Sequence, residues 1–217
     1  MKIALIGGTG FVGSAVLAEL AQRGHQVTAL ARNPAKTAAR PGVTVVQADV
    51  TDAAQVERAV AGADAVISAY NPGWESPALY ELFMAGTNAT LAGVKRAGLK
   101  RLLVVGGAGS LFVAPGVQLV DTEGFKSQVP AHIIPGARAA RDALEILRGE
   151  TALDWTLISP PALLAPGERT GKFRIGGDEL LMNGDAPAGI SVADLAVAIV
   201  DEIETPAHVR ARFTVGY

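Results

Sequence analysis

The chain has 217 residues, a formal net charge of −2 and no cysteine, and 49% of its residues are hydrophobic. This length suits one domain over 1–217 with a sizeable core. Acidic and basic residues are interspersed, so the sequence predicts neither a nucleic-acid partner nor an anionic membrane surface. The absence of cysteine excludes disulfides, thiolate nucleophiles and cysteine metal sites. The three histidines lie far apart in sequence, so we expect no metal centre. No apolar segment approaches the ~20 residues that cross a bilayer, and we expect a cytoplasmic protein.

Strand and helix patterns alternate along the chain, which is typical of a parallel sheet covered by helices on both faces. We therefore predict an α/β fold with a doubly wound parallel sheet. The predicted strands lie at 2–6, 26–31, 43–48, 65–70, 101–106, 154–159 and 211–216. The predicted helices lie at 11–23, 52–61, 78–97, 138–149 and 191–204.

Short polar residues mark two of the predicted helix starts. Asp52 stands three residues before Gln55, and Ser191 stands three residues before Asp194. This spacing lets two polar side chains cap the first turn of a helix. Gly24 stands where the first helix must end.

The first predicted strand runs directly into glycines spaced G-x-x-G-x-x-G, at Gly7, Gly10 and Gly13. We expect Gly7 to permit the tight turn, Gly10 to let the backbone approach a pyrophosphate, and Gly13 to let the helix pack on the sheet. Free N–H groups at the start of the helix can then bind the anion. A glycine-rich structural turn is the alternative, but a strand before the motif and a helix after it favour a nucleotide phosphate site.

The end of the second strand indicates which dinucleotide the site prefers. A site for NAD normally places an acidic side chain there to bind the adenosine ribose, whereas this chain has Leu30 and Ala31 followed by Arg32. Because a guanidinium matches a phosphate with a fork of donors, Arg32 is predicted to hold a 2′-phosphate. We predict NADPH as the preferred cofactor, with NADH as the alternative; a solvated surface role is the alternative for Arg32.

Two further strand ends are predicted to complete the cleft. Asp49 follows the third strand and is expected to bind the adenine amino group while Val50 packs on the ring; alternatively, Asp49 only begins the next helix. Residues 68–73 follow the fourth strand, and their small side chains are expected to let the backbone approach the cofactor. An exposed turn is the alternative for this segment. The predicted cofactor contacts are Gly7, Thr9, Gly10, Phe11, Val12, Gly13, Arg32, Asp49, Val50, Ala69, Tyr70, Asn71, Gly106 and Gly107.

Two irregular stretches, 107–137 and 160–190, are rich in Gly and Pro and follow the carboxyl ends of strands. Ligands bind at that edge of an open α/β sheet, so we expect functional loops, with 160–190 as a small C-terminal extension on the substrate side. Both stretches are expected to supply an apolar slot, unless their apolar residues are ordinary core. The candidate walls are Leu111, Phe112, Phe125, Pro160, Pro161 and Leu164.

The segments 7–13, 31–34 and 48–51 resemble those of the atypical short-chain dehydrogenase/reductases, an NAD(P)-binding Rossmann superfamily. Later segments are similar to those of the NADH-flavin reductase group within it. They are 104–111, 153–161, 166–171 and 190–196, together with the C-terminal sequence 212–217. The resemblance spans essentially the whole chain and implies a Rossmann fold and an NAD(P)H-dependent reductase.

Typical members of that superfamily carry a Tyr-x-x-x-Lys pair on the helix before the sixth strand, and this chain lacks it. Its tyrosines are Tyr70, Tyr80 and Tyr217, and none is followed by lysine four residues later. The region where the pair should lie has one lysine, Lys126, and no tyrosine. Ser110 lies near the position of the superfamily's catalytic serine, yet a loop-capping serine explains it equally well.

The missing pair restricts the chemistry. Reduction of an isolated carbonyl needs a positioned proton donor, commonly worth ~10²–10⁴-fold in rate. His132 is a candidate acid, although a surface role in a Pro-flanked loop is favoured. Flavins and quinones spread the arriving charge over a conjugated ring, so binding beside the nicotinamide is most of what they require. We predict a reductase for such acceptors, as a monomer or homodimer; the alternative is a non-catalytic NAD(P)-binding sensor.

Overall fold

The computed structural model describes residues 1–36 and 40–217 and has an eight-stranded sheet at its centre. Along the sheet the order of strands is β10-β14-β8-β5-β4-β1-β2-β3. Seven strands are parallel, and β10 pairs antiparallel with β14 at one edge. The parallel strands are β1 (Lys2–Ile6), β2 (Gln26–Ala31), β3 (Val43–Gln47), β4 (Ala65–Ser68), β5 (Arg101–Val105), β8 (Asp154–Ser159) and β14 (Ala211–Gly216).

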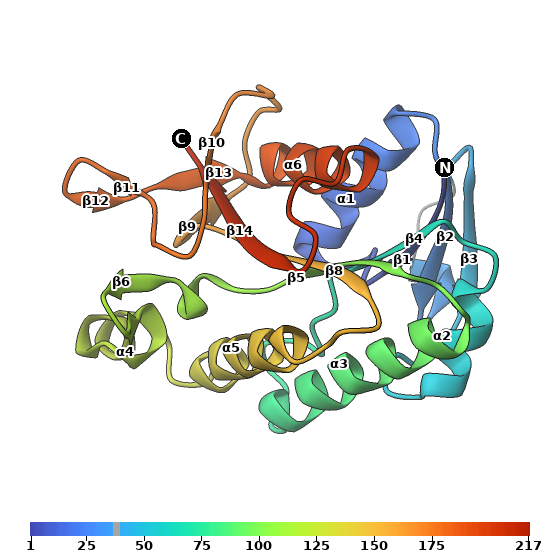
Figure 1. The fold of residues 1–217 in the computed structure, drawn as a ribbon, viewed down its shortest axis with the longest axis horizontal. Helices are drawn as coiled ribbons and strands as arrows, with labels where there is room; N and C mark the ends of the chain where they lie inside the picture. The colour runs from blue at the N-terminus through green and yellow to red at the C-terminus, as the bar shows by residue number, and fades with distance from the viewer. Residues whose placement is uncertain (37–39) are drawn as a thin grey trace.

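Helices cover both faces of the sheet, as Figure 1 shows. One face carries α1 (Phe11–Gln22) and α6 (Val192–Glu204), and the other carries α2 (Ala53–Val60), α3 (Leu79–Arg96) and α5 (Ile134–Arg148). Each face has its own hydrophobic core, and the central strands supply residues to both. These strands are continuous apolar runs because a parallel sheet is buried on both sides. The architecture is that of a doubly wound Rossmann fold, which confirms the prediction.

The predicted strands and most predicted helices begin and end within two residues of the observed ones. The exception is α5, which begins at Ile134, four residues before the predicted start. Pro135 made this segment look like a turn, but proline is tolerated in the first turn of a helix. The predicted caps are present, because Asp52 accepts hydrogen bonds from the backbone N–H groups of Ala54 and Gln55, and Ser191 accepts one from that of Asp194.

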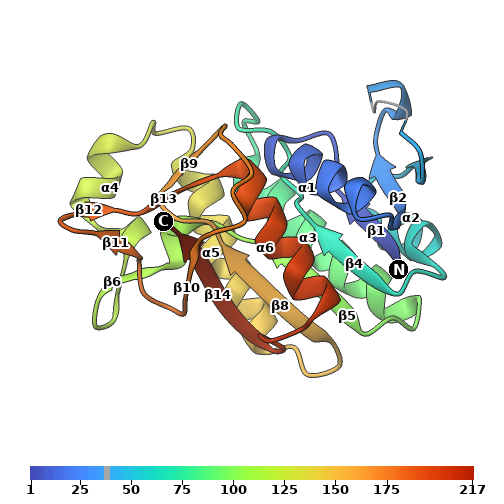
Figure 2. The same cartoon turned by 90° about the horizontal axis from the view of Figure 1, so that it is seen from above.

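The two irregular stretches contain short elements that the sequence did not indicate, and Figure 2 shows most of them gathered at the end of the molecule remote from β1 and β2. The first stretch contains β6 (Phe112–Ala114), β7 (Val117–Gln118) and α4 (Glu123–Gln128), with 3-10 turns at Ala108–Ser110 and Leu119–Asp121. The second contains β9 (Leu163–Ala165), β10 (Arg174–Gly176), β11 (Met182–Asn183), β12 (Ala186–Pro187) and β13 (Gly189–Ser191). A further 3-10 turn, Pro34–Lys36, follows β2.

The strand order reverses between β1 and β4, since the chain moves outward from β1 to β3 and then crosses back to β4. In open α/β sheets a crevice forms at the carboxyl ends of the strands at such a switch point. Within residues 1–36 and 40–217, no helix is both long enough and apolar enough to cross a membrane.

Candidate functional site

The glycine turn between β1 and α1 brings three backbone segments into close approach. Gly7 has a φ of +80°, and a Cβ added to it would stand 2.3 Å from the carbonyl oxygen of Ala69, beyond β4. A Cβ added to Gly13 would stand 2.0 Å from the carbonyl oxygen of Gly7. Both positions require glycine, Gly7 for its left-handed backbone and Gly13 for the contact of helix with turn.

Gly10 differs from these two glycines, because a Cβ added there would meet only the Gly7 carbonyl oxygen, at 3.3 Å, within 4 Å. Gly10 is the N-cap of α1, no side chain caps this helix, and its first turn contains no acidic residue. The first i→i−4 hydrogen bond of α1 joins the Ser14 N–H to the Gly10 carbonyl. The backbone N–H groups before it are therefore available to an anion, and the open space over Gly10 fits a pyrophosphate.

A cleft continues from this turn across the ends of β2, β3 and β4. It collects predicted cofactor contacts from four separate parts of the chain. Its lining consists of Gly7, Thr9, Leu30, Ala31, Arg32, Ala48, Asp49, Val50, Thr51, Tyr70, Asn71, Pro72 and Leu82. The sequence analysis did not predict that Leu82, in the first turn of α3, lines the cleft. A leucine near a predicted helix start was the available signal, and in the structure 38% of its surface is exposed.

Arg32 lies exposed on the rim of the cleft, directly after the buried Leu30 and Ala31. Asp49 lines the same cleft, and its Oδ1 accepts hydrogen bonds from the N–H and hydroxyl of Thr51. The N-cap of α2 is Asp52. The helix-starting role considered for Asp49 is therefore performed by another residue.

Tyr70 forms a wall of the cleft and is held from behind by α3. A Cβ added to Gly86 would stand 2.2 Å from Cε1 of Tyr70, so the ring lies against the bare backbone of the helix. The Tyr70 hydroxyl donates a hydrogen bond to the Leu82 carbonyl, 3.2 Å away. Burial raises the pKa of Tyr70. A glycine inside a predicted helix signals such close packing, but it does not indicate the partner.

Gly106 and Gly107 follow β5, and alanines of α5 lie nearest to this turn on the side of that helix. A Cβ added to Gly107 would lie 3.4 Å from Cβ of Ala140, and one added to Gly109 would lie 3.5 Å from Cβ of Ala137. The face of α5 against this turn therefore carries alanines. Gly106 itself packs closely against Leu157 of β8.

The hydroxyl groups of the three tyrosines all donate hydrogen bonds within the protein. Tyr70 donates to a main-chain carbonyl, Tyr80 donates to Asp142 at 2.8 Å, and Tyr217 donates to Asp194 at 2.8 Å. The hydrogen bond to the Asp142 carboxylate raises the pKa of Tyr80.

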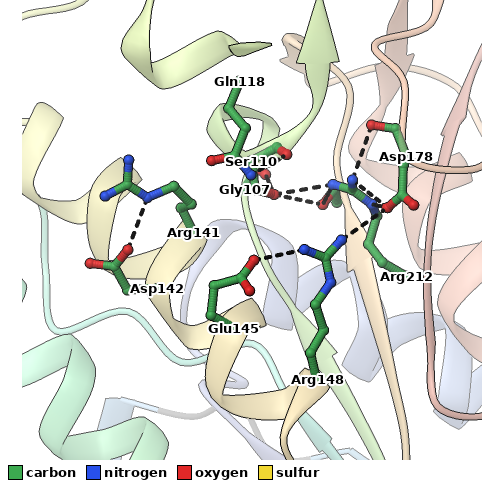
Figure 3. A network of polar contacts seen from close by, with 10 residues as sticks. Gly107, Ser110, Gln118, Arg141, Asp142, Glu145, Arg148, Asp178 and Arg212 are labelled. Atoms are coloured by element: carbon green, nitrogen blue, oxygen red, sulfur yellow. Dashed lines mark hydrogen bonds and ion pairs between the residues drawn. The ribbon is translucent and has the colours of Figure 1, made fainter. Parts of the chain in front are cut away.

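Ser110 lies in a buried polar network (Figure 3), and only 1% of its surface is exposed. Its hydroxyl accepts a hydrogen bond from Arg212 at 3.2 Å, lies 3.3 Å from the hydroxyl of Ser159, and donates to the Gly107 carbonyl at 3.2 Å. Arg212 is buried as well and donates from Nε to Asp178 at 2.6 Å. Burial lowers the pKa of Arg212, and the hydrogen bond to Asp178 offsets part of this effect. These contacts are the ones expected of a loop-capping serine.

The predicted walls of an apolar slot do not form a single cavity. Leu111, Pro160 and Pro161 are buried, and Leu164 packs against the core. Phe112 lines a separate apolar groove with 113–116, Glu179, Leu180 and Met182, and Phe125 is half-buried in α4. His132 lies exposed in its loop, 3.5 Å from Glu75, as expected for a surface residue.

A glycine turn and a cleft at the switch point of a doubly wound sheet define a nucleotide-binding protein of the Rossmann type. A family model described as NAD(P)H-binding matches residues 7–206, and the chain belongs to this family. The cofactor class is therefore a nicotinamide dinucleotide, and the family is of the oxidoreductase type.

The solved structures that are similar to the chain over its whole length include the following three. A protein from Burkholderia pseudomallei, provisionally named an exported protein, is 47% identical with a TM-score of 0.88, and all of both chains is covered. A provisionally named epimerase from Bacteroides thetaiotaomicron is 44% identical over the whole chain and 96% of its own, with a TM-score of 0.91. A provisionally named NADH-flavin reductase from Streptococcus pneumoniae TIGR4 is 31% identical over the whole chain and 99% of its own, with a TM-score of 0.84.

Proposed function

We propose that this protein is a reductase that uses NADPH to reduce a flavin, a quinone or a related conjugated acceptor. The observation that carries the proposal is that the sequence lacks the Tyr-x-x-x-Lys pair and that, within the described residues, each tyrosine hydroxyl is hydrogen-bonded to a carbonyl or carboxylate of the protein. The face of α5 beside Gly107 carries Ala137 and Ala140, and each tyrosine hydroxyl already donates elsewhere. An isolated carbonyl needs a positioned proton donor, whereas a conjugated ring delocalises the charge and takes its proton from water.

In this proposal the cleft holds the cofactor in an extended form. Backbone N–H groups of Phe11, Val12 and Gly13 bind the pyrophosphate, and Gly10 leaves room for it. Arg32 binds the 2′-phosphate, and Asp49, Val50 and Tyr70 surround the adenine end of the cleft. Asn71 of the cleft, with Ala69, Gly106 and Gly107 outside its lining, is proposed to lie along the path to the nicotinamide. When bound, the cofactor supplies the hydride. The protein contributes orientation and the exclusion of competing reactions.

The acceptor is proposed to bind on the side of 160–190, within a single domain that spans 1–217. These residues extend from the carboxyl end of β8, the edge at which the glycine turn also lies. The similarity to a protein named NADH-flavin reductase supports this class of acceptor. The cytoplasmic location stays a prediction, since one relative carries the name of an exported protein.

The test is NADPH oxidation by the purified protein with FMN, riboflavin and menadione, and with benzaldehyde and cyclohexanone as carbonyl controls. We expect turnover with the first group and little with the second. NADPH deuterated on the transferred face should give a primary isotope effect on acceptor reduction. Tight NADPH binding without turnover of any acceptor would favour the non-catalytic sensor. Efficient turnover of cyclohexanone would contradict the argument from the missing donor.

A further inference from the structure

The 166–171 loop, with the sequence Pro-Gly-Glu-Arg-Thr-Gly, is a motif that the cofactor cleft leaves unexplained. The loop follows β9, which begins four residues after the carboxyl end of β8. Strand β9 pairs in parallel with β13, which leads directly into α6. The loop therefore extends from the edge of the sheet at which ligands bind.

Arg169 in this loop binds Glu19, which lies on the cofactor helix α1. Its Nε and one terminal nitrogen each donate to a different oxygen of the Glu19 carboxylate, both at 2.7 Å. Only 4% of the Glu19 side chain is exposed, against 43% of that of Arg169. The hydrogen bond from Arg169, helped by Arg23, holds the pKa of Glu19 below its usual value. A buried carboxylate on α1 thus serves as an anchor for a loop 150 residues away in sequence.

The next two residues of the loop are held by a second buried carboxylate, Asp194 of α6. The N–H groups of Thr170 and Gly171 donate to its Oδ1 at 2.8 and 2.7 Å, and the Thr170 hydroxyl donates to Oδ2. Tyr217 donates to the same oxygen. Burial raises the pKa of Asp194, but these hydrogen bonds outweigh burial and the pKa lies below its usual value.

Glu168 is held as well, because the Ser191 hydroxyl donates to its carbonyl oxygen at 2.7 Å. A Cβ added to Gly167 would stand 2.9 Å from Cβ of Ser191, so the loop lies close against the β13–α6 corner. The loop is therefore tied on one side to α6 and on the other to α1. Among the described residues, the hydrogen bonds that join the loop to α1 are those of Arg169 with Glu19.

We propose that Arg169 is a positioning residue, which through Glu19 fixes the 160–171 segment relative to α1 and so sets the position of the acceptor beside the nicotinamide. This inference rests on the proposed function. It predicts that loss of the contact weakens acceptor binding while the cofactor cleft stays intact. A displacement of about 1 Å in such a site can cost ~100-fold in rate, so a loosened wall has a measurable effect.

The chain offers a matched control for this contact. Arg23 also donates to Glu19, at 2.7 Å, but its other partners are Asp201 and Glu204 of α6. In Arg169→Ala the buried Glu19 carboxylate keeps Arg23 as its partner, so the variant should fold. In Arg23→Ala the loop keeps Arg169. Arg169→Lys retains the charge but loses the two-donor fork.

The experiment measures FMN binding to the NADP⁺-loaded protein by flavin fluorescence, NADPH binding by calorimetry, and hydrogen–deuterium exchange of the cofactor-free protein. Arg169→Ala should weaken FMN binding by about tenfold, leave NADPH affinity within about twofold, and speed exchange over 168–171. Arg169→Lys should recover part of the FMN affinity. Arg23→Ala should leave FMN binding and exchange of the loop close to those of the native protein.

Unchanged FMN binding in Arg169→Ala, with faster exchange of the loop, would overturn the positioning role. An equal loss of FMN affinity in Arg23→Ala would overturn it too. FMN binding would then depend on the charge environment of Glu19 and not on the position of the loop. If the native protein binds FMN but turns over no acceptor, a tenfold loss in Arg169→Ala supports the positioning role while the reductase proposal fails. If the native protein binds neither FMN nor menadione, both proposals fail.

Discussion

The carbonyl oxygen of Gly7 lies 2.0 Å from where a Cβ of residue 13 would stand, so the first turn of α1 packs on the glycine turn only because residue 13 is glycine. At Gly10, three residues earlier, an added Cβ would stand 3.3 Å from the same oxygen and would meet no other atom within 4 Å. One short motif therefore contains two structural glycines and one glycine, Gly10, that is proposed to face the pyrophosphate. Substitutions at Gly10 and Gly13 should separate these two roles.

Gly10→Val is expected to abolish NADPH binding while the fold persists. Gly10 has an extended backbone, with φ −80° and ψ 175°, which suits a β-branched residue, and the added side chain would occupy the proposed pyrophosphate space. Gly13→Ala should instead destabilise the protein by about 3 kcal/mol, since the added methyl overlaps the main chain. Calorimetry with NADPH and thermal melts measure the two effects. Native NADPH affinity in folded Gly10→Val would remove the glycine turn as the phosphate site.

Arg32→Ala should weaken NADPH binding and spare NADH. Charged hydrogen bonds to a phosphate contribute about 1.5–3 kcal/mol, which corresponds to a loss of roughly ten- to a hundredfold. Affinities of both cofactors for both proteins, measured by calorimetry, provide the test. Equal losses for NADPH and NADH, or a native preference for NADH, would contradict the 2′-phosphate contact.

Gly86→Ala should weaken binding of NADPH and NADH alike. The added methyl would stand 2.2 Å from the Tyr70 ring, so the ring must move into the adenine side of the cleft. The loss should be about three- to tenfold, comparable to one aromatic contact. Gly124→Ala is the control, because a Cβ at that helical position in α4 meets nothing within 4 Å. A loss confined to NADPH would point to an effect on Arg32 instead.

Ser110→Ala should change the stability of the protein more than its turnover. The variant removes one acceptor of Arg212, which keeps Ser159 and Asp178, and one buried hydrogen bond contributes about 1 kcal/mol, or a melting temperature lower by about 2–4 °C. Acceptor reduction should stay within about threefold, whereas loss of a general acid would cost ~10²–10⁴-fold. Steady-state rates with menadione and thermal melts distinguish these outcomes.

Glu19→Gln should destabilise the protein at neutral pH but not in acid. The pKa of Glu19 is lowered in the folded protein from its ordinary value of 4.5, so its contribution to stability is fully present above pH 4.5. It is lost as the pH falls through the folded-state pKa. We expect a melting temperature lower by about 2–4 °C at pH 7, with the difference from the native protein shrinking below pH 4.5. A difference that stays constant down to pH 3 would exclude the charged contact with Arg169.

The seven parallel strands and the five main helices were predictable because their signals are local. A parallel strand buried on both faces is a continuous apolar run, and an amphipathic helix repeats its apolar residues every 3.6 positions. The glycine turn between β1 and α1 was predictable for a related reason, since Gly7, Gly10 and Gly13 lie within one short segment. Its chemistry depends on backbone that the sequence itself specifies.

Contacts between distant segments came only from the tertiary structure. Arg212 is 102 residues from Ser110, Gly86 lies under Tyr70 in the middle of α3, and β10 is a three-residue strand that is recognisable only by its pairing with β14. No local pattern shows which long polar side chain will bind which buried carboxylate, because that depends on where the packing of the sheet and helices brings remote loops. The sequence by itself therefore determined the doubly wound fold and the glycine turn between β1 and α1. Tertiary packing decided that Ser110 is enclosed and that Arg169 joins the 166–171 loop to α1.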